Sequence, residues 1–270
     1  MKKILAIVLA LVMIMGAVLT MSSCSKDDKT LVCGVTIFEK MNEKDENGNW
    51  TGFESEFAME VGKIIGMEVK FQEIEWGQKY NELNSGAIDC IWNGFTANSS
   101  DKDPSGKDVK RSDLVDFSYG YMLNQQCIVV KKANLANFTS EESLKGKTAC
   151  AEGGSAGEAY AKGATDADKV LPASSQLKAF PEVMSGAVDF IVVDILLAKN
   201  ICGEGDYEDL TIVEDIELAS EIYAIGFKKG SKLTEKVNAA IKQLDENGKL
   251  MEIATKYGFQ NVLKVSETIE

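Results

Sequence analysis

The spacing of apolar positions alternates between that of strands and that of helices along most of the chain. The strand-like runs cover residues 31–37, 69–74 and 88–92. The helix-like spacing is clearest where apolar residues stand at Phe53, Phe57, Val61, Ile64 and Ile65. Gly66 suits the end of that helix, residues 76–83 predict a further helix, and Asn47-Gly48 is a hairpin turn signal. Strands that alternate with helices are typical of an α/β fold with a mainly parallel sheet.

A short stretch of sequence occurs twice, 100 residues apart. Residues 85–91 read SGAIDCI and residues 185–191 read SGAVDFI, and each copy stands between a predicted helix and a predicted strand. This shared placement predicts two lobes of similar topology. Ligands of open α/β sheets bind beyond the carboxyl ends of strands. The repeated strands end at residues 93–96 and at Asp194, so we expect a site that takes one part from each lobe.

The first thirty residues have the pattern of an export signal. Lys2 and Lys3 precede an apolar run over residues 4–19, shorter than the roughly 20 residues of a membrane-spanning helix. Ser22-Ser23-Cys24 then resembles a bacterial lipoprotein lipobox. The resemblance implies a signal peptide over residues 1–23, lipidation (palmitate) of Cys24 and a polar tether over residues 24–30; the alternative is a plain secretory signal. We expect an extracytoplasmic protein, anchored by lipid to the outer face of the bacterial cytoplasmic membrane, or a periplasmic one.

Composition narrows the function classes. Acidic residues number 42 against 29 basic ones, and the resulting net charge of −13 disfavours nucleic-acid binding. Histidine is absent, which removes Ser-His-Asp and Cys-His catalysis and every metal site that uses histidine. The cysteines show no CxxC spacing, so a zinc site is not expected. We therefore predict no catalytic residues, no metal and no cofactor.

Five cysteines remain besides Cys24, and an odd number cannot all pair within one chain. Most of them stand in apolar runs, where a cysteine behaves as a small buried hydrophobe. A disulfide between neighbouring strands, such as Cys33 with Cys90, stays open because export is compatible with oxidation.

Arg111 is the single arginine among the 29 basic residues. A chain that otherwise uses lysine favours arginine where the planar fork matters, such as bidentate binding of a carboxylate. The alternative is a surface arginine without a special role. Residues 153–157 (GGSAG) stand between a predicted strand and a predicted helix, where they form either an anion-binding helix start or a simple tight turn.

Asp194 directly follows the apolar run of residues 190–193. A carboxylate in that place loses its solvent unless it meets a cation, which points to a counter-ion for a ligand ammonium group. The alternative is an N-cap for a helix that begins at residue 195. A fork for a carboxylate, N–H groups for an anion and an acid for an ammonium group together suit an α-amino acid.

Seven ordered segments resemble motifs of the family 3 extracellular solute-binding proteins, over nearly the whole mature chain. They are GFESEFA (52–58), Trp76 with LNSG (83–86), NGFT (93–96), Arg111 with VDFS (115–118), LKGK (144–147), GSAG (154–157) and VDFIVVD (188–194). The resemblance implies a two-lobed periplasmic-binding-protein-like (type II) α/β fold, with a mixed sheet flanked by helices in each lobe and two hinge crossings. Lobe 1 would take residues 31–124 and 225–270, and lobe 2 residues 125–224.

The same resemblance implies capture of a polar L-amino acid, such as glutamine, glutamate or cystine, and its delivery to the permease subunits of an ABC importer. In this interpretation Arg111 and the N–H groups of Thr96 and Ala156 hold the α-carboxylate. Asp194, the Thr96 hydroxyl and the Gly94 carbonyl bind the α-ammonium group. The further implied ligand-binding residues are Asn93, Ser155, Phe38 as an aromatic cover and Phe53 beside it.

The chain departs from the family pattern near the expected site. Thr96 and Arg111 are fifteen residues apart, farther than in the family, so residues 99–110 look inserted. The insert begins like an EF-hand calcium loop but has Ser112 where the final glutamate belongs, so we expect a solvated polar loop. Thr36 stands near a position that is acidic in some relatives, which argues against a cationic ligand side chain.

Two alternative functions stay open. One is an exported dehydratase-like enzyme on the same fold, which would act on a prephenate-like carboxylic acid and would have Glu39 or Glu152 near the cleft. The other is a sensor ectodomain that acts through a partner protein.

Overall fold

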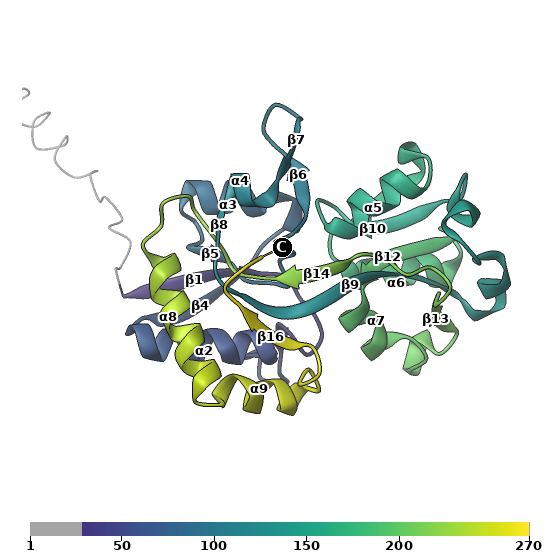
Figure 1. Ribbon diagram of the computed structural model, residues 1–270. Coiled ribbons are helices and arrows are strands. Elements are labelled where there is room, and N and C mark those ends of the chain that lie inside the picture. The colour runs from purple at the N-terminus through teal and green to yellow at the C-terminus, as the bar shows by residue number, and fades with distance from the viewer. Residues whose placement is uncertain (1–28, 270) are drawn as a thin grey trace, which may run out of the picture. The chain divides into compact units, whose positions relative to one another are not determined.

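Strands and helices alternate along the chain in a computed structural model that describes residues 29–269 (Figure 1). The predicted signal peptide over residues 1–23 and the predicted lipidation site at Cys24 lie outside the described residues. The strands are β1 (Thr30–Val35), β2 (Glu43–Lys44), β3 (Trp50–Thr51), β4 (Glu68–Glu73), β5 (Cys90–Ile91), β6 (Ser100–Lys102), β7 (Asp108–Lys110), β8 (Asp116–Phe117), β9 (Gly120–Lys131), β10 (Ala149–Glu152), β11 (Val170–Ala173), β12 (Phe190–Asp194), β13 (Leu210–Ile212), β14 (Ser220–Tyr223), β15 (Gly226–Phe227) and β16 (Leu263–Ser266). The α-helices are α2 (Phe53–Ile65), α3 (Lys79–Ser85), α4 (Arg111–Leu114), α5 (Ala156–Ala164), α6 (Gln176–Ser185), α7 (Ile195–Ile201), α8 (Leu233–Glu246) and α9 (Lys249–Tyr257). Short 3-10 helices are η1 (Trp76–Gln78), η2 (Lys132–Asn137), η3 (Glu141–Leu144), η4 (Ala167–Lys169) and η5 (Gly205–Tyr207).

The longer strands form two mixed sheets. The first has the order β4-β1-β5-β15-β8, and the second has the order β11-β10-β12-β9-β13, with β14 and β16 also paired to β9. β1 is parallel to β5, and β10 is parallel to both β11 and β12. β15 and β9 run antiparallel to their partners in the two sheets. The expectation of an α/β fold with a mixed sheet in each half is confirmed.

The repeated sequence occupies the same place in both sheets. α3 and α6 each end in the repeat, at Gly86 and Gly186, and both glycines take the left-handed conformation with a φ of 81°. A residue with a side chain rarely adopts that conformation, so glycine is the natural end of both helices. The strands that follow, β5 and β12, lie parallel to β1 and β10.

The aspartate of the repeat has the same hydrogen bond in both copies. Asp89 Oδ2 accepts the backbone N–H of Val32 at 2.9 Å, and Asp189 Oδ2 accepts that of Thr148 at 2.8 Å. Each carboxylate thereby ties the start of the repeated strand to the neighbouring parallel strand. The two halves share a local construction as well as a sequence.

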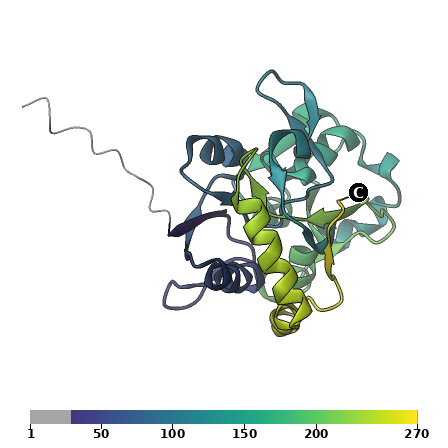
Figure 2. The ribbon, with the colours of Figure 1, turned by 60° about the vertical axis from the view of Figure 1, so that its left-hand side comes forward.

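Successive side chains of a strand point to opposite faces of the sheet, and both faces of the second sheet are apolar and covered by helices. Ile128 and Val192 point to the cluster that contains Ala161 of α5, whereas Val129 and Val193 belong to the cluster with α6 and α7. In the first half, α2 packs against α8 and α9 and lies along β4 (Figures 1 and 2).

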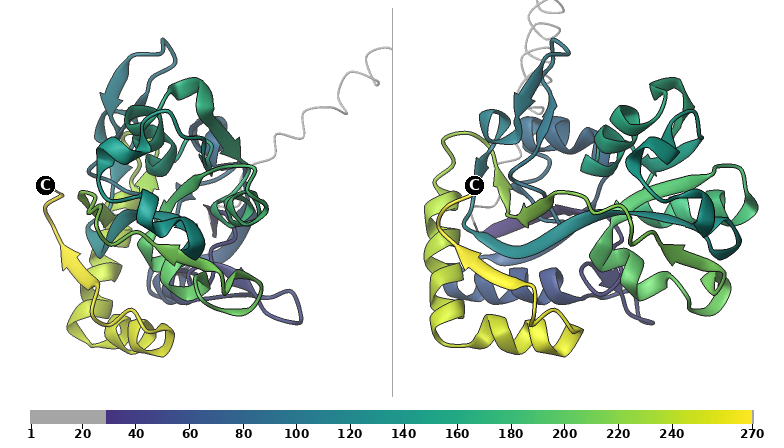
Figure 3. Two further views of the ribbon diagram at one scale, coloured as in Figure 1. Left: turned by 90° about the vertical axis from the view of Figure 1, so that its right-hand side faces the viewer. Right: turned by 45° about the vertical axis from the view of Figure 1, so that its right-hand side comes forward.

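β9 is a long strand of the second sheet that runs from the first half of the molecule into the second (Figure 1). Its first half pairs with β14 and β16, and its second half pairs with β12 and β13 (Figure 3). Residues 124–125 of β9 therefore lie beside residues 220–221 of β14, where the pairing of β9 changes from β14 to β12. The exact lobe boundaries, at residues 124 and 225, stay predictions.

The inserted residues form a hairpin rather than an irregular loop. β6 and β7 pair antiparallel and project from the first half (Figure 1). The Asp103 carboxylate closes the turn by accepting the backbone N–H groups of Ser105 and Lys107, at 2.8 and 3.0 Å. The aspartate that resembled a calcium ligand thus serves the turn itself.

Cys33 and Cys90 are register partners on β1 and β5, with their Sγ atoms 3.6 Å apart. Cys127 and Cys150 are buried, as expected for cysteines in apolar strands. Within residues 29–269, no helix combines the length and the apolar character of a membrane span.

Candidate functional site

A small cavity lies where the strand ends of the two sheets meet. Its volume is about 10 Å³. The residues that line it are Trp76, Asn93, Gly94, Thr96, Arg111, Gln126, Glu152, Ser155, Ala156, Gln176 and Asp194. The cavity lies at the ends of β5, β10 and β12, which is the place that the sheet topology predicts for a ligand.

Arg111 is buried at the start of α4, with 1% of its surface exposed. Its Nη1 donates to the carbonyl of Thr96 at 3.0 Å, and its Nε donates to Asp101 Oδ2 at 3.1 Å. The guanidinium plane lies over the ring of Phe95, 5.0 Å from its centre. Nη2 has no acceptor among the described residues. A buried guanidinium N–H group without an acceptor is costly, so this edge of Arg111 is suited to an anion.

Asp194 faces Arg111 from the end of β12. It stands at the first position before α7 but makes no capping hydrogen bond with its side chain. Its carboxylate accepts the side-chain amides of Gln126, Gln176 and Asn124 instead. Burial raises the pKa of Asp194, while these amide hydrogen bonds oppose the shift. The helix-cap alternative is therefore not realised, and the carboxylate belongs to the cavity.

A second carboxyl group, Glu221 of β14, lies behind Asp194. Asn124 Nδ2 and Gln126 Nε2 donate to its Oε2 at 2.6 and 3.0 Å, so the two acids share the same amide donors. Burial, followed by the charge of Asp194, raises the pKa of Glu221 to about 7. Two acidic groups are thus concentrated on this side of the cavity.

The turn after β5 is held from behind by Glu54 of α2. Glu54 is fully buried and accepts the N–H of Gly94 at 2.7 Å, an amide hydrogen of Asn42 at 2.5 Å and the hydroxyl of Tyr121. Burial raises its pKa to about 7 against these hydrogen bonds. Asn93, the residue before Gly94 in the turn, accepts a hydrogen bond from the Asn42 amide as well. This network fixes the backbone of the turn whose residues line the cavity.

The glycine-rich loop forms a capped helix start beside the cavity. Ser155 Oγ accepts the N–H of Glu158 at 3.0 Å, and α5 begins at Ala156. Gly154 has a φ of 75°, and its carbonyl accepts Lys79 Nζ of α3 at 2.9 Å. The predicted loop thus contacts the first half of the molecule.

Most of the predicted site residues come together at this cavity. Those that line it are Arg111, Asp194, Thr96, Gly94, Asn93, Ala156 and Ser155. Phe38 is buried against the Gly94 turn, since a Cβ on Gly94 would stand 3.3 Å from its ring. It is not among the residues that line the cavity. Phe53 lies in the core, next to Phe57 and edge-on to Phe259, away from the cavity lining.

Sequence reasoning missed several polar neighbours of the cavity. Gln126 and Gln176 line it, while Asp101 and Lys79 contact Arg111 and the glycine loop from outside. Gln126 and Glu221 come together only because β14 pairs with β9, and a single sequence does not reveal that pairing. Asp101 lies in the insert, which carries no family motif.

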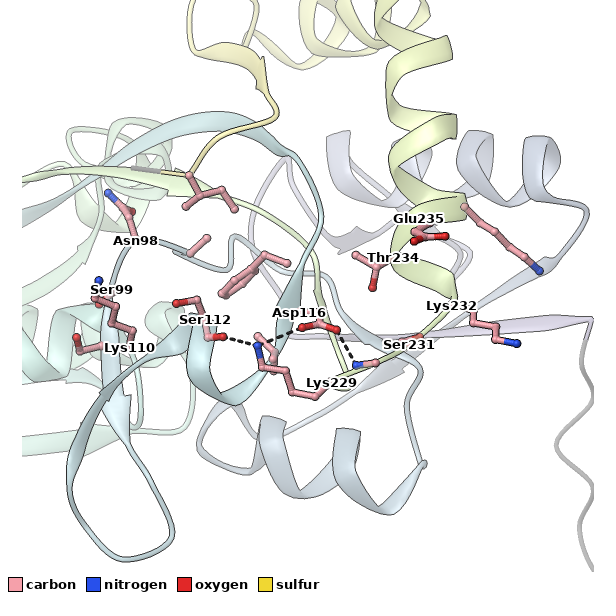
Figure 4. A pocket seen from close by; sticks show the side chains of 17 residues that line it. Asn98, Ser99, Lys110, Ser112, Asp116, Lys229, Ser231, Lys232, Thr234 and Glu235 are labelled. Atoms are coloured by element: carbon pink, nitrogen blue, oxygen red, sulfur yellow. Dashed lines mark hydrogen bonds and ion pairs between the residues drawn. The ribbon is translucent and has the colours of Figure 1, made fainter.

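A larger hollow, of about 1100 Å³, lies on another face of the first half (Figure 4). At its centre Asp116 pairs with Lys229 at 3.1 Å and accepts the N–H of Gly230 at 2.6 Å. Lys229 also donates to the carbonyl of Ser112. These groups satisfy one another, so the VDFS segment (115–118) has a structural role here, and the size of the hollow does not make it the ligand site.

A cavity between two mixed sheets, with a buried arginine on one wall and a buried carboxylate on the other, is the arrangement of a two-lobed ligand-binding protein. The sequence-family model of the bacterial extracellular solute-binding proteins, family 3, matches residues 31–261 of this chain. The chain belongs to this family.

Individual relatives agree with that assignment. The L-cystine-binding protein TcyA of Bacillus subtilis (strain 168) is 31% identical over 216 residues, which cover 79% of this chain and 75% of the relative. The arginine-binding extracellular protein ArtP of the same organism is 27% identical over 238 residues, covering 87% and 89%. A solved structure, an ancestral arginine-binding protein bound to arginine, is 32% identical with a TM-score of 0.74, covering 85% of this chain and 98% of that one.

Proposed function

We propose that this protein captures an α-amino acid between its two lobes outside the cytoplasm and delivers it to the permease subunits of an ABC importer. The observation that carries the proposal is the buried guanidinium of Arg111, with Nη2 unpartnered among the described residues, in the same cavity as Asp194. The guanidinium suits an α-carboxylate, and the carboxylate of Asp194 suits an α-ammonium group.

The other lining residues complete this assignment. We assign the N–H groups of Thr96 and Ala156 to the α-carboxylate, and the Thr96 hydroxyl and Gly94 carbonyl to the α-ammonium group. Asn93 and Ser155 support the two loops that supply these groups. Phe38 and Phe53 then act from the core, as supports of the Gly94 turn and of α2.

The size of the cavity implies movement. A volume of about 10 Å³ is close to the least that holds one water molecule, far below that of an amino acid. Entry of a ligand therefore requires the lobes, residues 31–124 with 225–270 and residues 125–224, to separate. β9 and β14, which are paired with each other where the chain passes from one half to the other, are the natural hinge strands for such a motion.

The proposed location follows from the first thirty residues. A signal peptide over residues 1–23 and lipidation at Cys24 would anchor the protein at the outer face of the bacterial cytoplasmic membrane, or place it in the periplasm. The tether over residues 24–30 would leave the binding lobes free to meet the permease.

The relatives reported above are named as binding proteins, which favours capture and release over a dehydratase-like turnover. Mutation of Arg111 tests the proposal directly. Removing one partner of a buried charge pair costs about 2–5 kcal/mol, so Arg111→Ala abolishes binding at micromolar ligand. Arg111→Lys also weakens binding, because lysine cannot form the bidentate contact.

A further inference from the structure

Glu152 has no role in the binding of an amino-acid head group described above. It ends β10, is 2% exposed and lines the same cavity as Arg111 and Asp194. Its Oε1 is buried and has no hydrogen-bond partner among the described residues. A buried carboxyl oxygen without a partner is costly, so its presence at a ligand cavity needs an explanation.

The nearest cation does not explain it. Lys79 influences Glu152 electrostatically, but its Nζ donates to the Gly154 carbonyl at 2.9 Å and pairs with Asp101 at 3.5 Å. Lys79 also lies over the rings of Trp76 and Tyr80. Within residues 29–269, no ion pair joins Lys79 to Glu152. The lysine is therefore committed elsewhere.

Acidic groups outnumber basic groups around the cavity. The carboxyl groups are Asp101, Glu152, Asp194 and Glu221, and the cations are Arg111 and Lys79. An amino acid with an uncharged side chain adds one positive and one negative charge, so it leaves the excess of carboxyl groups as it was. A ligand with an additional cation reduces that excess at the point where Glu152 has no partner.

We propose, on the basis of the proposed function, that the ligand carries a second cationic group besides its α-ammonium and that the carboxylate of Glu152 binds it. The chemistry is that of an ammonium or guanidinium group. A cationic side chain supplies it and also reduces the excess of carboxyl groups, whereas the second amino-acid half of cystine supplies the ammonium group together with a further carboxylate. Trp76, which lines the cavity, offers an apolar wall to the connecting carbon chain. Glu152 ends β10 of the second sheet, whereas Thr36 follows β1 of the first, so the expectation drawn from Thr36 does not bear on this acid.

Calorimetry on the purified protein with matched ligands tests this proposal. Arginine is compared with citrulline, which has nearly the same shape without the positive charge, and lysine and cystine form separate arms. We expect the cationic member to bind at least about tenfold more tightly than its neutral counterpart. The Glu152→Gln variant should reduce that ratio to below about threefold. Glu142→Gln, which changes an exposed acid paired with Lys145, should keep it.

A second measurement needs no variant. Burial, followed by the charge of Asp194, raises the pKa of Glu152 to about 8, with Lys79 opposing and Glu75 adding to the shift. Glu152 must lose its proton to face a cation, so at pH 7 the cationic ligand should release close to one more proton than citrulline. Glu221 and Asp194 also titrate near the cavity, but both ligands meet them alike.

The outcomes distinguish failure of the proposed role of Glu152 from failure of the proposed amino-acid binding. Equal affinity for arginine and citrulline, with cystine no tighter than either, would overturn the role of Glu152 and leave amino-acid capture intact. An unchanged ratio in Glu152→Gln would do the same. If no amino acid binds, both fail together. Tight binding of cystine alone identifies the second ammonium group as the partner, whereas tight binding of arginine or lysine identifies a cationic side chain.

Discussion

At the scale of single residues, neutral or oppositely charged neighbours fix the orientation of each charged group in the cavity. Arg111 is fixed along one edge by Asp101 and the Thr96 carbonyl, and its other edge stays available. Asp194 is held by side-chain amides, which satisfy a buried carboxylate without neutralising it. Both groups are thus oriented before a ligand arrives, which reduces the ordering cost of binding.

Asp101 is predicted to position Arg111 for its ligand. Its Oδ2 accepts the Arg111 Nε at 3.1 Å and the Tyr80 hydroxyl at 2.8 Å, and Lys79 Nζ lies 3.5 Å away. Asp101→Asn removes the charge that holds both cations, and we expect amino-acid affinity to fall about tenfold in calorimetry.

The same hairpin supplies a matched control for that variant. Asp108→Asn changes an exposed acid whose partner is Lys102, so binding should stay as in the unchanged protein. If Asp101→Asn binds as tightly as Asp108→Asn does, the hairpin has no part in the site.

The residue types that sequence reasoning identified are those whose chemistry is unusual for their place. A single arginine in a lysine-rich chain and a carboxylate after an apolar strand are visible without a structure. Gln126 and Gln176 carry no such signal, because a glutamine in a strand or at a helix start is ordinary. The sequence predicted only that Glu152 lies near the cleft. That its Oε1 has no hydrogen-bond partner among the described residues depends on three-dimensional packing.

At the scale of elements, the internal repeat is the feature that sequence and structure share most fully. α3 with β5 and α6 with β12 end and begin at equivalent repeat positions, next to a parallel strand. The helix over residues 53–65 and its end at Gly66 were also predictable, because the apolar spacing and the glycine agree.

We predict that the two aspartates of the repeat contribute similarly to stability. Asp89→Ala and Asp189→Ala each remove the acceptor of a backbone N–H group that water can reach, and each should lower the free energy of unfolding by about 0.5–1.5 kcal/mol. Urea unfolding of both variants measures the effect. A loss confined to one of them would show that the repeat is not a shared structural device.

Other elements could not be derived from the chain alone. The predicted helix over residues 76–83 begins as a 3-10 turn, and the strand expected over residues 88–92 pairs only at Cys90 and Ile91. The hairpin of the insert was expected to be a solvated loop, because alternation over three-residue strands is too short to detect. The position of β9 in the second sheet depends on partners far away in sequence.

At the scale of the whole molecule, the buried acids couple stability to pH. Burial raises the pKa of Glu54 and Glu221 to about 7 and that of Glu152 to about 8, from 4.5 in each case. Between these values the folded state binds more protons than the unfolded state. The contribution of these groups is thus complete below about pH 4.5 and is lost as the pH rises through 7 to 8.

The ligand-free protein should therefore be more stable at pH 5 than at pH 8.5. Denaturant unfolding at several pH values measures this, and Glu152→Gln should reduce the loss at the upper end of the range. Stability that rises between pH 5 and pH 8.5 would mean that the acids are ionised in the folded state.

The central claim is that the Arg111 and Asp194 cavity binds an amino acid, and a thermal-shift screen of the standard amino acids and cystine tests it most directly. A ligand at a hundredfold its Kd adds about 2.7 kcal/mol of stability, which is a readable shift in Tm. We predict a selective shift in the unchanged protein that disappears in Arg111→Ala. The same shift in Arg111→Ala, or no shift with any amino acid, would contradict the account.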